Sequence, residues 1–247
     1  ISLCMMCHSG MQMIYPLKRE SAYSDWQIVG ETTSGSHEVL GAFIDSAIVD
    51  QLAAALKRSG FLTVALEFSS ISLARFIKER SQLDLTRPYL ILHLSVEGID
   101  FSVINEGSLF FNHFISWPNA EQVTFDGFKR VVTSELKKIL NLYDNRWGTP
   151  LANVLLFSNQ PTKEITEWLQ SDFSMAVSAV DRYQDLDSGW FVVMGAALRG
   201  LIRRADDRFI SLTKVGTEEE FLRSRVWRFL SVWRTVIISM MVLVIAL

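Results

Sequence analysis

The stretch YLILHLSVEGIDFSVINEGSLFFNHFISW, residues 89–117, decides the fold. It consists of three short runs rich in β-branched and aromatic residues, separated by turn residues at Glu97-Gly98 and at Asn105-Glu106-Gly107. Runs of this length joined by tight turns predict an antiparallel meander. Its three strands are expected at Tyr89–Leu94, Ile99–Ile104 and Leu109–Ile115.

Downstream of the meander, the sequence alternates between helix and strand patterns. Apolar residues at helical spacing predict a long helix over 123–143, and two shorter ones over 162–170 and 190–204. Between them, 153–157 and 175–180 are short apolar runs of the kind found in buried parallel strands. The order β-β-β-α-β-α-β-α is that of the ribonuclease-H-like half of an actin-type fold, so we expect an α/β protein.

The segment before the meander predicts a smaller α+β unit. Two β-like runs, 22–29 and 38–44, flank a Gly/Ser/Thr stretch and predict a hairpin. A helix is expected over 46–59, a short strand over 62–68, and a second helix that ends near Arg80.

Composition and charge exclude several classes. With 247 residues and 49% hydrophobic content, the chain can bury a real core and is not disordered. Its 24 basic and 27 acidic residues give a net charge of -3, which argues against nucleic-acid binding. Residues 199–247 carry nine basic and five acidic residues, or +4, which leaves -7 for residues 1–198.

The two cysteines stand in the run Cys4-Met5-Met6-Cys7-His8, which matches the c-type haem attachment pattern. The match has only three fixed positions, and haem attachment requires the extracytoplasmic side. No second cysteine pair exists to complete a zinc site. We therefore expect a core or junction segment here, and no metal.

The C-terminal segment 235–247 contains no charged residue. Its thirteen residues span roughly 20 Å as a helix, short of a ~30 Å hydrocarbon core. A buried helix and a surface-lying amphipathic helix are two readings; the third, which we favour, is a transmembrane helix that continues past Leu247. The six Arg and Trp residues just before this segment are of the types found at a membrane interface: Arg223, Arg225, Trp227, Arg228, Trp233 and Arg234. Because positive charge marks the cytoplasmic side, the arginines place residues 1–226 in the cytoplasm.

Five stretches, in this order and spacing, resemble the PilM-type type IV pilus assembly proteins and the related cytoplasmic half of GspL of type II secretion. They are IYPLKRESAYSDWQ (14–27), SGFLTVALEFSSISLAR (59–75), LILHLSVEGIDFSVINEGSLFFN (90–112), NVLLFSNQPTKEITEWL (153–169) and VMGAALRGL (193–201).

This resemblance implies an actin-like fold with a small inserted α+β subdomain, followed by a C-terminal membrane helix. We expect truncation at both ends, because the chain begins with Ile1 and stops inside an apolar run. The expected parts are the inserted subdomain (1–61), a return segment of the first actin-like lobe (62–86), the second lobe (87–206), a linker with a docking peptide (207–226) and the start of a transmembrane helix (227–247).

The resemblance also locates the nucleotide site of the family. His93 and Ser95 stand where the family has Asp-x-Gly, and Asn159 and Gln160 stand where it has paired glycines. Imidazole is a poor magnesium ligand, and side chains obstruct the close approach of backbone to phosphate. We therefore expect a degenerate site, no cofactor, no catalytic residue and no enzyme activity. The alternative is an ATP-binding ATPase whose phosphate loop precedes Ile1.

Residues 209–213, Phe-Ile-Ser-Leu-Thr, resemble the start of PilN, whose N-terminal peptide binds PilM in that family. Ile210, Ser211 and Leu212 are therefore expected to bind a partner. The implied protein is a cytoplasmic scaffold anchored in the bacterial inner membrane, in a type IV pilus or type II secretion platform. Its expected partners are PilN/PilO-like proteins and the assembly ATPase; self-association is left open.

Overall fold

The computed structural model describes residues 4–7, 22–31, 35–80, 83–117, 125–158, 162–180, 182–183, 186–203, 206–213 and 217–246. The chain forms two compact units, each described below by itself. The first comprises Ile1–Ile14, Asp25–Phe43 and Glu67–Ile210, and the second comprises Tyr15–Ser24, Ile44–Leu66 and Ser211–Leu247.

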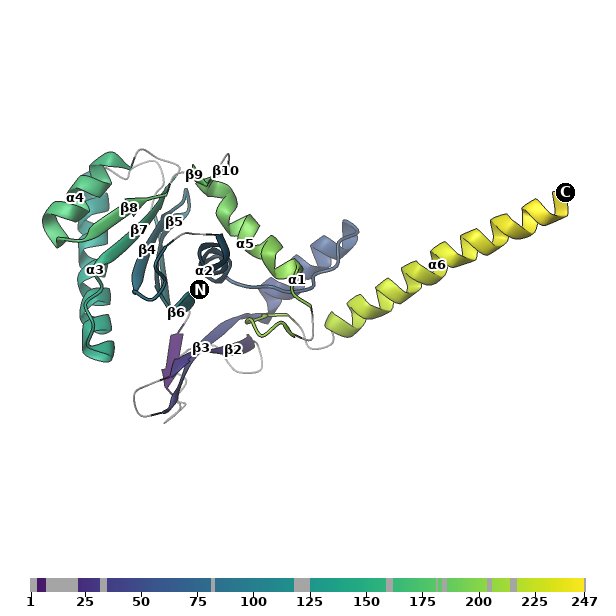
Figure 1. The fold of residues 1–247 in the computed structure, drawn as a ribbon, viewed down its shortest axis with the longest axis horizontal. Coiled ribbons are helices and arrows are strands. Elements are labelled where there is room, and N and C mark those ends of the chain that lie inside the picture. The colour runs from purple at the N-terminus through teal and green to yellow at the C-terminus, as the bar shows by residue number, and fades with distance from the viewer. Residues whose placement is uncertain are drawn as a thin grey trace. The chain divides into compact units, whose positions relative to one another are not determined.

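A five-stranded sheet is the centre of the first unit (Figure 1). Its order is β6-β5-β4-β7-β8, with the first three strands antiparallel and β4, β7 and β8 parallel. The predicted meander is confirmed, as is the predicted mixed α/β class. The strands are β4 (Tyr89–Leu94), β5 (Gly98–Asn105), β6 (Ser108–Ser116), β7 (Asn153–Ser158) and β8 (Ala176–Ala179).

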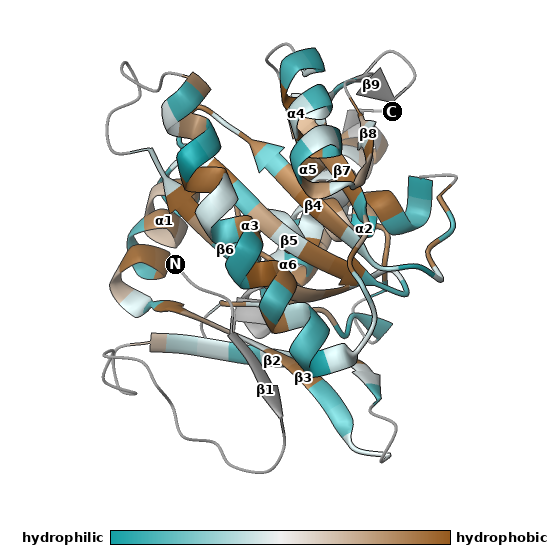
Figure 2. Cartoon of the chain, turned by 90° about the vertical axis from the view of Figure 1, so that its left-hand side faces the viewer, coloured by the Kyte–Doolittle hydropathy of each residue, from teal (hydrophilic) through white to brown (hydrophobic). Residues whose placement is uncertain are grey.

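One face of this sheet carries the main hydrophobic core. Helices α3 (Phe125–Trp147) and α4 (Lys163–Phe173) lie on this face, as Figure 1 shows. Side chains alternate across a strand, so Leu90 and Leu92 of β4 point into this core. Figure 2 shows the hydrophobic strands behind the hydrophilic outer surface of α3. The core includes Phe101, Val132, Leu136, Val154, Leu156 and Leu169, none of them measurably exposed.

The opposite face is covered by α2 (Ser69–Arg80) and α5 (Phe191–Gly200). The Phe191 ring stacks on Phe76 at 4.7 Å and meets Phe157 of β7 edge-on at 5.8 Å. A Cβ at Gly195 would lie 1.8 Å from the carbonyl oxygen of Ser72, so only glycine lets these two helices approach so closely. Between β8 and α5 lie β9 (Arg182–Tyr183), β10 (Leu186–Asp187) and a short 3-10 helix, Ser188–Trp190.

The predicted N-terminal hairpin is present as β2 (Ala22–Glu31) and β3 (His37–Asp45). A third strand, β1 (Cys4–Cys7), pairs antiparallel with β3 in the order β1-β3-β2. Glu38 of β3 is buried, and it accepts a hydrogen bond from the Trp147 indole at 3.0 Å. This bond joins the hairpin to the end of α3 within the first unit.

Helix α1 (Ser46–Arg58) belongs to the second unit. Asp45 caps it by accepting from the Ala47 amide at 2.8 Å, and Gly60 ends it with a φ of +84°. The strand predicted over 62–68 is wrong: residues 61–68 form no strand in the described structure. A run of β-formers becomes a strand only when a neighbouring strand pairs with it, and local sequence does not supply that neighbour.

Helix α6 (Thr217–Ala246) runs without a break across residue 227. No break separates the expected linker from the expected membrane segment, because no Gly or Pro interrupts the run. Within the residues that the structure describes, no helix combines the length and the apolar character needed to cross a membrane. The predicted C-terminal membrane helix is thus not found there.

Candidate peptide-binding site

Four charged side chains form a buried network in the first unit. Glu67 precedes α2, Arg75 lies on α2, Arg199 ends α5, and Asp207 follows it; each side chain is at most 8% exposed. Arg199 contacts Glu67 at 2.5 Å and Asp207 at 2.9 Å, and Arg75 contacts Glu67 at 2.7 Å. Buried charges persist only when paired in this way.

The close approach of α2 and α5 brings the two arginines together. Arg75 donates to the Gly195 carbonyl at 2.8 Å and to both carboxylate oxygens of Glu67, each at 2.7 Å. Burial raises the pKa of Glu67, but hydrogen bonds from Arg75 and Ser72 and the charges of Arg75 and Arg199 outweigh it and lower the pKa. Glu67 is therefore ionised at neutral pH and fixes both guanidinium groups.

Arg199 also holds the main chain of the segment that follows it. It donates to the carbonyl oxygens of Phe209 at 2.9 Å and of Ile210 at 2.7 Å. The Ile210 amide donates to the Gln27 side chain at 3.2 Å. The Arg75 guanidinium lies 4.2 Å from the Phe209 ring centroid, at cation-π distance. The site thus grips two successive carbonyl groups and one aromatic ring.

The predicted docking residues are deeply placed. Ile210, in the first unit, has no measurable exposure. Leu212, in the second unit, is 1% exposed, and its amide donates to the Leu66 carbonyl at 2.8 Å. Ser211 lies between them and its hydroxyl is 3.2 Å from that of Thr213. In the first unit, the buried Ile210 side chain and the main-chain hydrogen bonds of this segment are contacts of the kind that extended peptides make when they bind.

His93 and Ser95, the predicted remnants of a nucleotide site, lie at the end of β4. His93 is opposite Asp100 of β5 and beside Phe157 of β7. Burial lowers its pKa, and the nearby charge of Glu97 offsets part of that effect. The imidazole is neutral at pH 7, so it supplies no positive charge to a phosphate. Asn159 and Gln160 lie outside the described residues.

Ser95 makes hydrogen bonds to other residues of the turn between β4 and β5. Its hydroxyl accepts from the amides of Glu97 at 3.2 Å and Gly98 at 3.3 Å, and its own amide donates to the Gly98 carbonyl at 2.9 Å. The Trp117 indole donates to the Ser95 carbonyl at 3.1 Å. Backbone amides that cradle phosphate must be free to do so. Here the turn uses these amides internally.

A second polar cluster lies on the sheet face that carries His93. Asp100 accepts from Ser102 at 3.0 Å and from Asn112, whose amide also donates to Ser102 at 3.0 Å. Burial raises the pKa of Asp100 to about 6, although these two hydrogen bonds act in the opposite direction. All three residues are buried.

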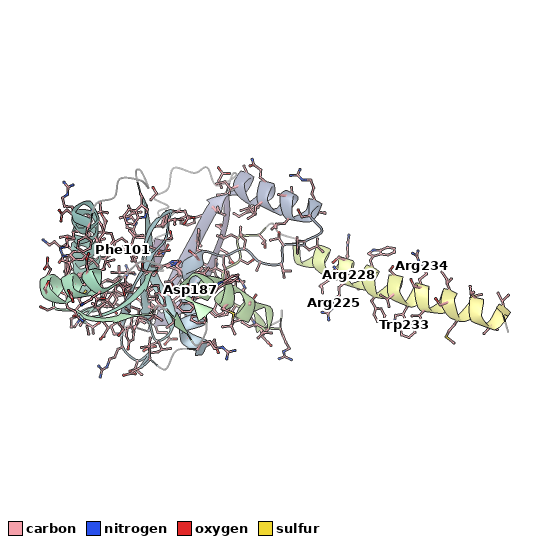
Figure 3. All side chains as sticks on the ribbon, turned by 90° about the horizontal axis from the view of Figure 1, so that it is seen from above. Phe101, Asp187, Arg225, Arg228, Trp233 and Arg234 are labelled. Atoms are coloured by element: carbon pink, nitrogen blue, oxygen red, sulfur yellow. The ribbon has the colours of Figure 1, made fainter. Side chains whose placement is uncertain are left out.

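The remaining predicted positions are spread along α6 and β1. All six interface residues predicted on α6 are exposed: Arg223, Arg225, Trp227, Arg228, Trp233 and Arg234. Figure 3 shows Arg225, Arg228, Trp233 and Arg234 projecting from the helix. Cys4 and Cys7 lie in β1, while His8 is outside the described residues. In the described part of the chain, no group of three or more His, Cys, Asp or Glu residues could hold a metal ion.

Sequence reasoning did not identify Glu67, Arg75 or Arg199. One signal was available: Arg199 interrupts the apolar helix VMGAALRGL, and Glu67 interrupts the apolar run LTVALEF. A charged residue at an otherwise buried position requires a partner. The identity of that partner, across 132 residues of sequence, follows only from the fold.

Comparison with solved structures places the fold. The chain superimposes on a structure described as the PilM-PilN type IV pilus biogenesis complex with a TM-score of 0.64 and 14% identity, over 81% of this chain and 76% of that chain. At this identity, the likeness shows a shared PilM-like α/β fold.

Two further structures match with lower scores. One is a Bacteroides thetaiotaomicron protein with an actin-like ATPase fold and unknown function (TM-score 0.40, 12% identity, 72% of this chain and 65% of that chain). The other is a diol dehydratase-reactivating factor in nucleotide-free form (TM-score 0.37, 11% identity, 72% and 44%). No protein-family model and no curated protein sequence matches the chain.

Proposed function

We propose that this chain is a scaffold of a type IV pilus assembly platform, working by protein-protein interaction and not by ATP turnover. In this proposal the body lies in the cytoplasm at the bacterial inner membrane, and PilN/PilO-like proteins and the assembly ATPase are its partners. The fold shared with the PilM-PilN complex structure supports the pilus role. The exposed arginine and tryptophan residues of α6 support the membrane location.

The grip of Arg199 on the Phe209 and Ile210 carbonyls carries the proposal. A guanidinium that donates to two successive main-chain carbonyls recognises an extended peptide irrespective of its side chains. Specificity then comes from the ring of Phe209 and from the buried side chain of Ile210. The occupant is a segment of this same chain that resembles the PilN N-terminus, so a docked peptide is part of how the scaffold is built.

The Ser95 turn supports a role without nucleotide turnover. Phosphoryl transfer depends on a metal held by carboxylates and on donors arranged around the phosphates. At this turn the carboxylate of the family is replaced by neutral His93, and the amides of Glu97 and Gly98 already donate to Ser95. We therefore expect no ATP hydrolysis and no bound nucleotide.

Partner capture tests the scaffold role. Changing Ile210 and Leu212 to alanine should reduce recovery of PilN/PilO-like partners and of the assembly ATPase in pull-downs. Both side chains are fully buried, so these changes also lower stability, by about 2–5 kcal/mol each. The matched control is Leu136→Ala with Ile139→Ala, which removes equally buried side chains from the α3 core. Equal partner loss in both double variants would contradict the proposal.

Calorimetry with magnesium-ATP tests the alternative. The scaffold proposal predicts no heat of binding and no phosphate release from this chain. Micromolar binding together with turnover that is abolished by His93→Ala would favour the ATP-dependent enzyme instead.

A further inference from the structure

The segment that Arg199 holds carries an acidic residue of its own, Asp207. Its side chain is 6% exposed, and its two oxygens have different partners. Oδ2 accepts from Arg199 Nε at 2.9 Å, and Oδ1 accepts from the Phe209 amide at 3.1 Å. A carboxylate that accepts from the amide two residues later forms an Asx turn, which fixes the local course of the chain. Asp207 therefore couples the guanidinium group to the main chain of the segment.

Charge complementarity favours an acid at this position. The buried network holds two guanidinium groups and two carboxylates: Arg75, Arg199, Glu67 and Asp207. Glu67 belongs to the site, whereas Asp207 belongs to the segment that the site holds. Without the Asp207 carboxylate, the network would hold one positive charge in excess at a buried position, which is costly. The site thus favours an acidic residue in the segment that occupies it.

The residues after Asp207 make contacts that define what can follow the acid. Arg208 is exposed, so its position tolerates other residues. The Phe209 ring centroid lies 4.2 Å from the guanidinium carbon of Arg75 and 5.9 Å from that of Arg199, so two cations favour an aromatic ring here. The Ile210 side chain has no measurable exposure, which favours an aliphatic group of similar size.

Gln27 of β2 fixes the register of the segment. Its side-chain oxygen accepts from the Ile210 amide at 3.2 Å, while Arg199 donates to the Ile210 carbonyl at 2.7 Å. Both main-chain polar groups of Ile210 are thus held by residues outside the segment. A proline at this position has no N–H, so the Gln27 oxygen would lose this donor.

We propose that the site takes extended peptides of one chemical class, Asp–any residue–aromatic–aliphatic with a main-chain N–H at the aliphatic position, and that Asp207 determines this specificity. Glutamate carries the charge but is one methylene group longer, so it does not form the Asx turn, and asparagine forms the turn without the charge. This assignment rests on the proposed function, because it names the peptides that would occupy the docking site in place of residues 207–210.

Peptide binding to an opened site tests the class. In the full chain, the combined change of Asp207, Phe209 and Ile210 to alanine releases the chain's own segment. A labelled, end-capped peptide of residues 207–211 is then titrated and followed by fluorescence polarisation. The changes Asp207→Asn and Ile210→Pro in the peptide should each raise the Kd at least ~10-fold. The matched control is Arg208→Ala in the peptide, which should leave the Kd within about twofold.

Two further measurements separate recognition from a merely structural role. In an opened chain that also carries Gln27→Met, the proline peptide should lose most of its disadvantage, because the oxygen that accepts from the amide is gone. Hydrogen exchange in the chain with its segment in place does not depend on the opened variant being folded. There, Asp207→Asn should speed exchange of the 207–213 amides at least ~10-fold, Asp207→Glu should have a smaller effect, and Arg208→Ala should have none.

Three results would overturn the proposal: equal binding of the parent and Asp207→Asn peptides, a proline disadvantage that survives Gln27→Met, and a folded opened chain that binds no peptide. Capture of pilus partners by the parent chain distinguishes this failure from that of the scaffold role. Selectivity lost with capture retained would reject the peptide class alone. Capture absent with selectivity present would reject the scaffold role alone.

Discussion

Replacing Arg199 by alanine removes one guanidinium from a site where every partner stays behind. Glu67 and Asp207 would lose a neutralising charge, and the carbonyls of Phe209 and Ile210 would lose their donor. Removing one member of a buried ion pair costs about 3–5 kcal/mol, because the other charge is left uncompensated. Arg75 still neutralises Glu67, so we expect the lower end of this range, about 3 kcal/mol.

The matched control is Arg203→Ala. Arg203 pairs with Asp206 at 2.7 Å, a bond as short as those of Arg199, but the arginine side chain is 86% exposed. Exposed ion pairs contribute little to stability, so this variant should unfold at nearly the same urea concentration as the parent chain. The two arginines are four residues apart and differ chiefly in burial, which isolates the effect of the buried network.

Urea unfolding followed by circular dichroism measures the difference in midpoint between the two variants. Limited proteolysis gives a local readout, since loss of the grip on Phe209 and Ile210 should expose the 207–213 segment to cleavage before global unfolding. The reasoning would be refuted if Arg199→Ala lowered the free energy of unfolding by less than about 1 kcal/mol and left the 207–213 segment protected from proteolysis.

Three further predictions follow from the described contacts. Asp100→Asn should stabilise the chain at pH 8. Burial raises the pKa of the Asp100 carboxyl from 3.8 to about 6, so above pH 6 its charge lowers the free energy of unfolding by about 3 kcal/mol. This cost disappears as the pH falls towards 4, because the carboxyl is then protonated in the folded chain. Thermal melts at both pH values check this, and an equal shift at both would contradict it. Gly195→Ala should lower the melting temperature by ten degrees or so or prevent folding, because its Cβ would lie 1.8 Å from the Ser72 carbonyl, whereas Gly200→Ala should be tolerated. Trp147→Phe should lower the free energy of unfolding by about 1–3 kcal/mol, since buried Glu38 loses its indole donor.

The central sheet was predictable from sequence because its signals are local. Tyr89–Leu94 was predicted as a strand and has these bounds as β4, since a continuous apolar run ends where Ser95 begins a turn. The β5–β6 turn followed from Glu106 and Gly107, which both adopt positive φ, the conformation that a tight hairpin demands.

The candidate site was only half predictable. Ile210 and Leu212 could be singled out because residues 209–213 resemble the start of PilN. The arginines that hold this segment could not, since Arg75 and Arg199 are brought together by the fit of two helices at Gly195. Residues 62–68 show the opposite case. Their sequence favours a strand, but a strand forms only where a neighbouring strand pairs with it.

The position of Arg199 also has a mechanical consequence. The chain enters the last segment of the first unit at Glu67 and leaves it at Ile210, and Arg199 bonds to both residues. Tension applied along α6 would reach Ile210 and load the Arg199 bonds before it reached the sheet. The Arg199 side chain would therefore transfer a force applied to the C-terminal helix to helices α2 and α5.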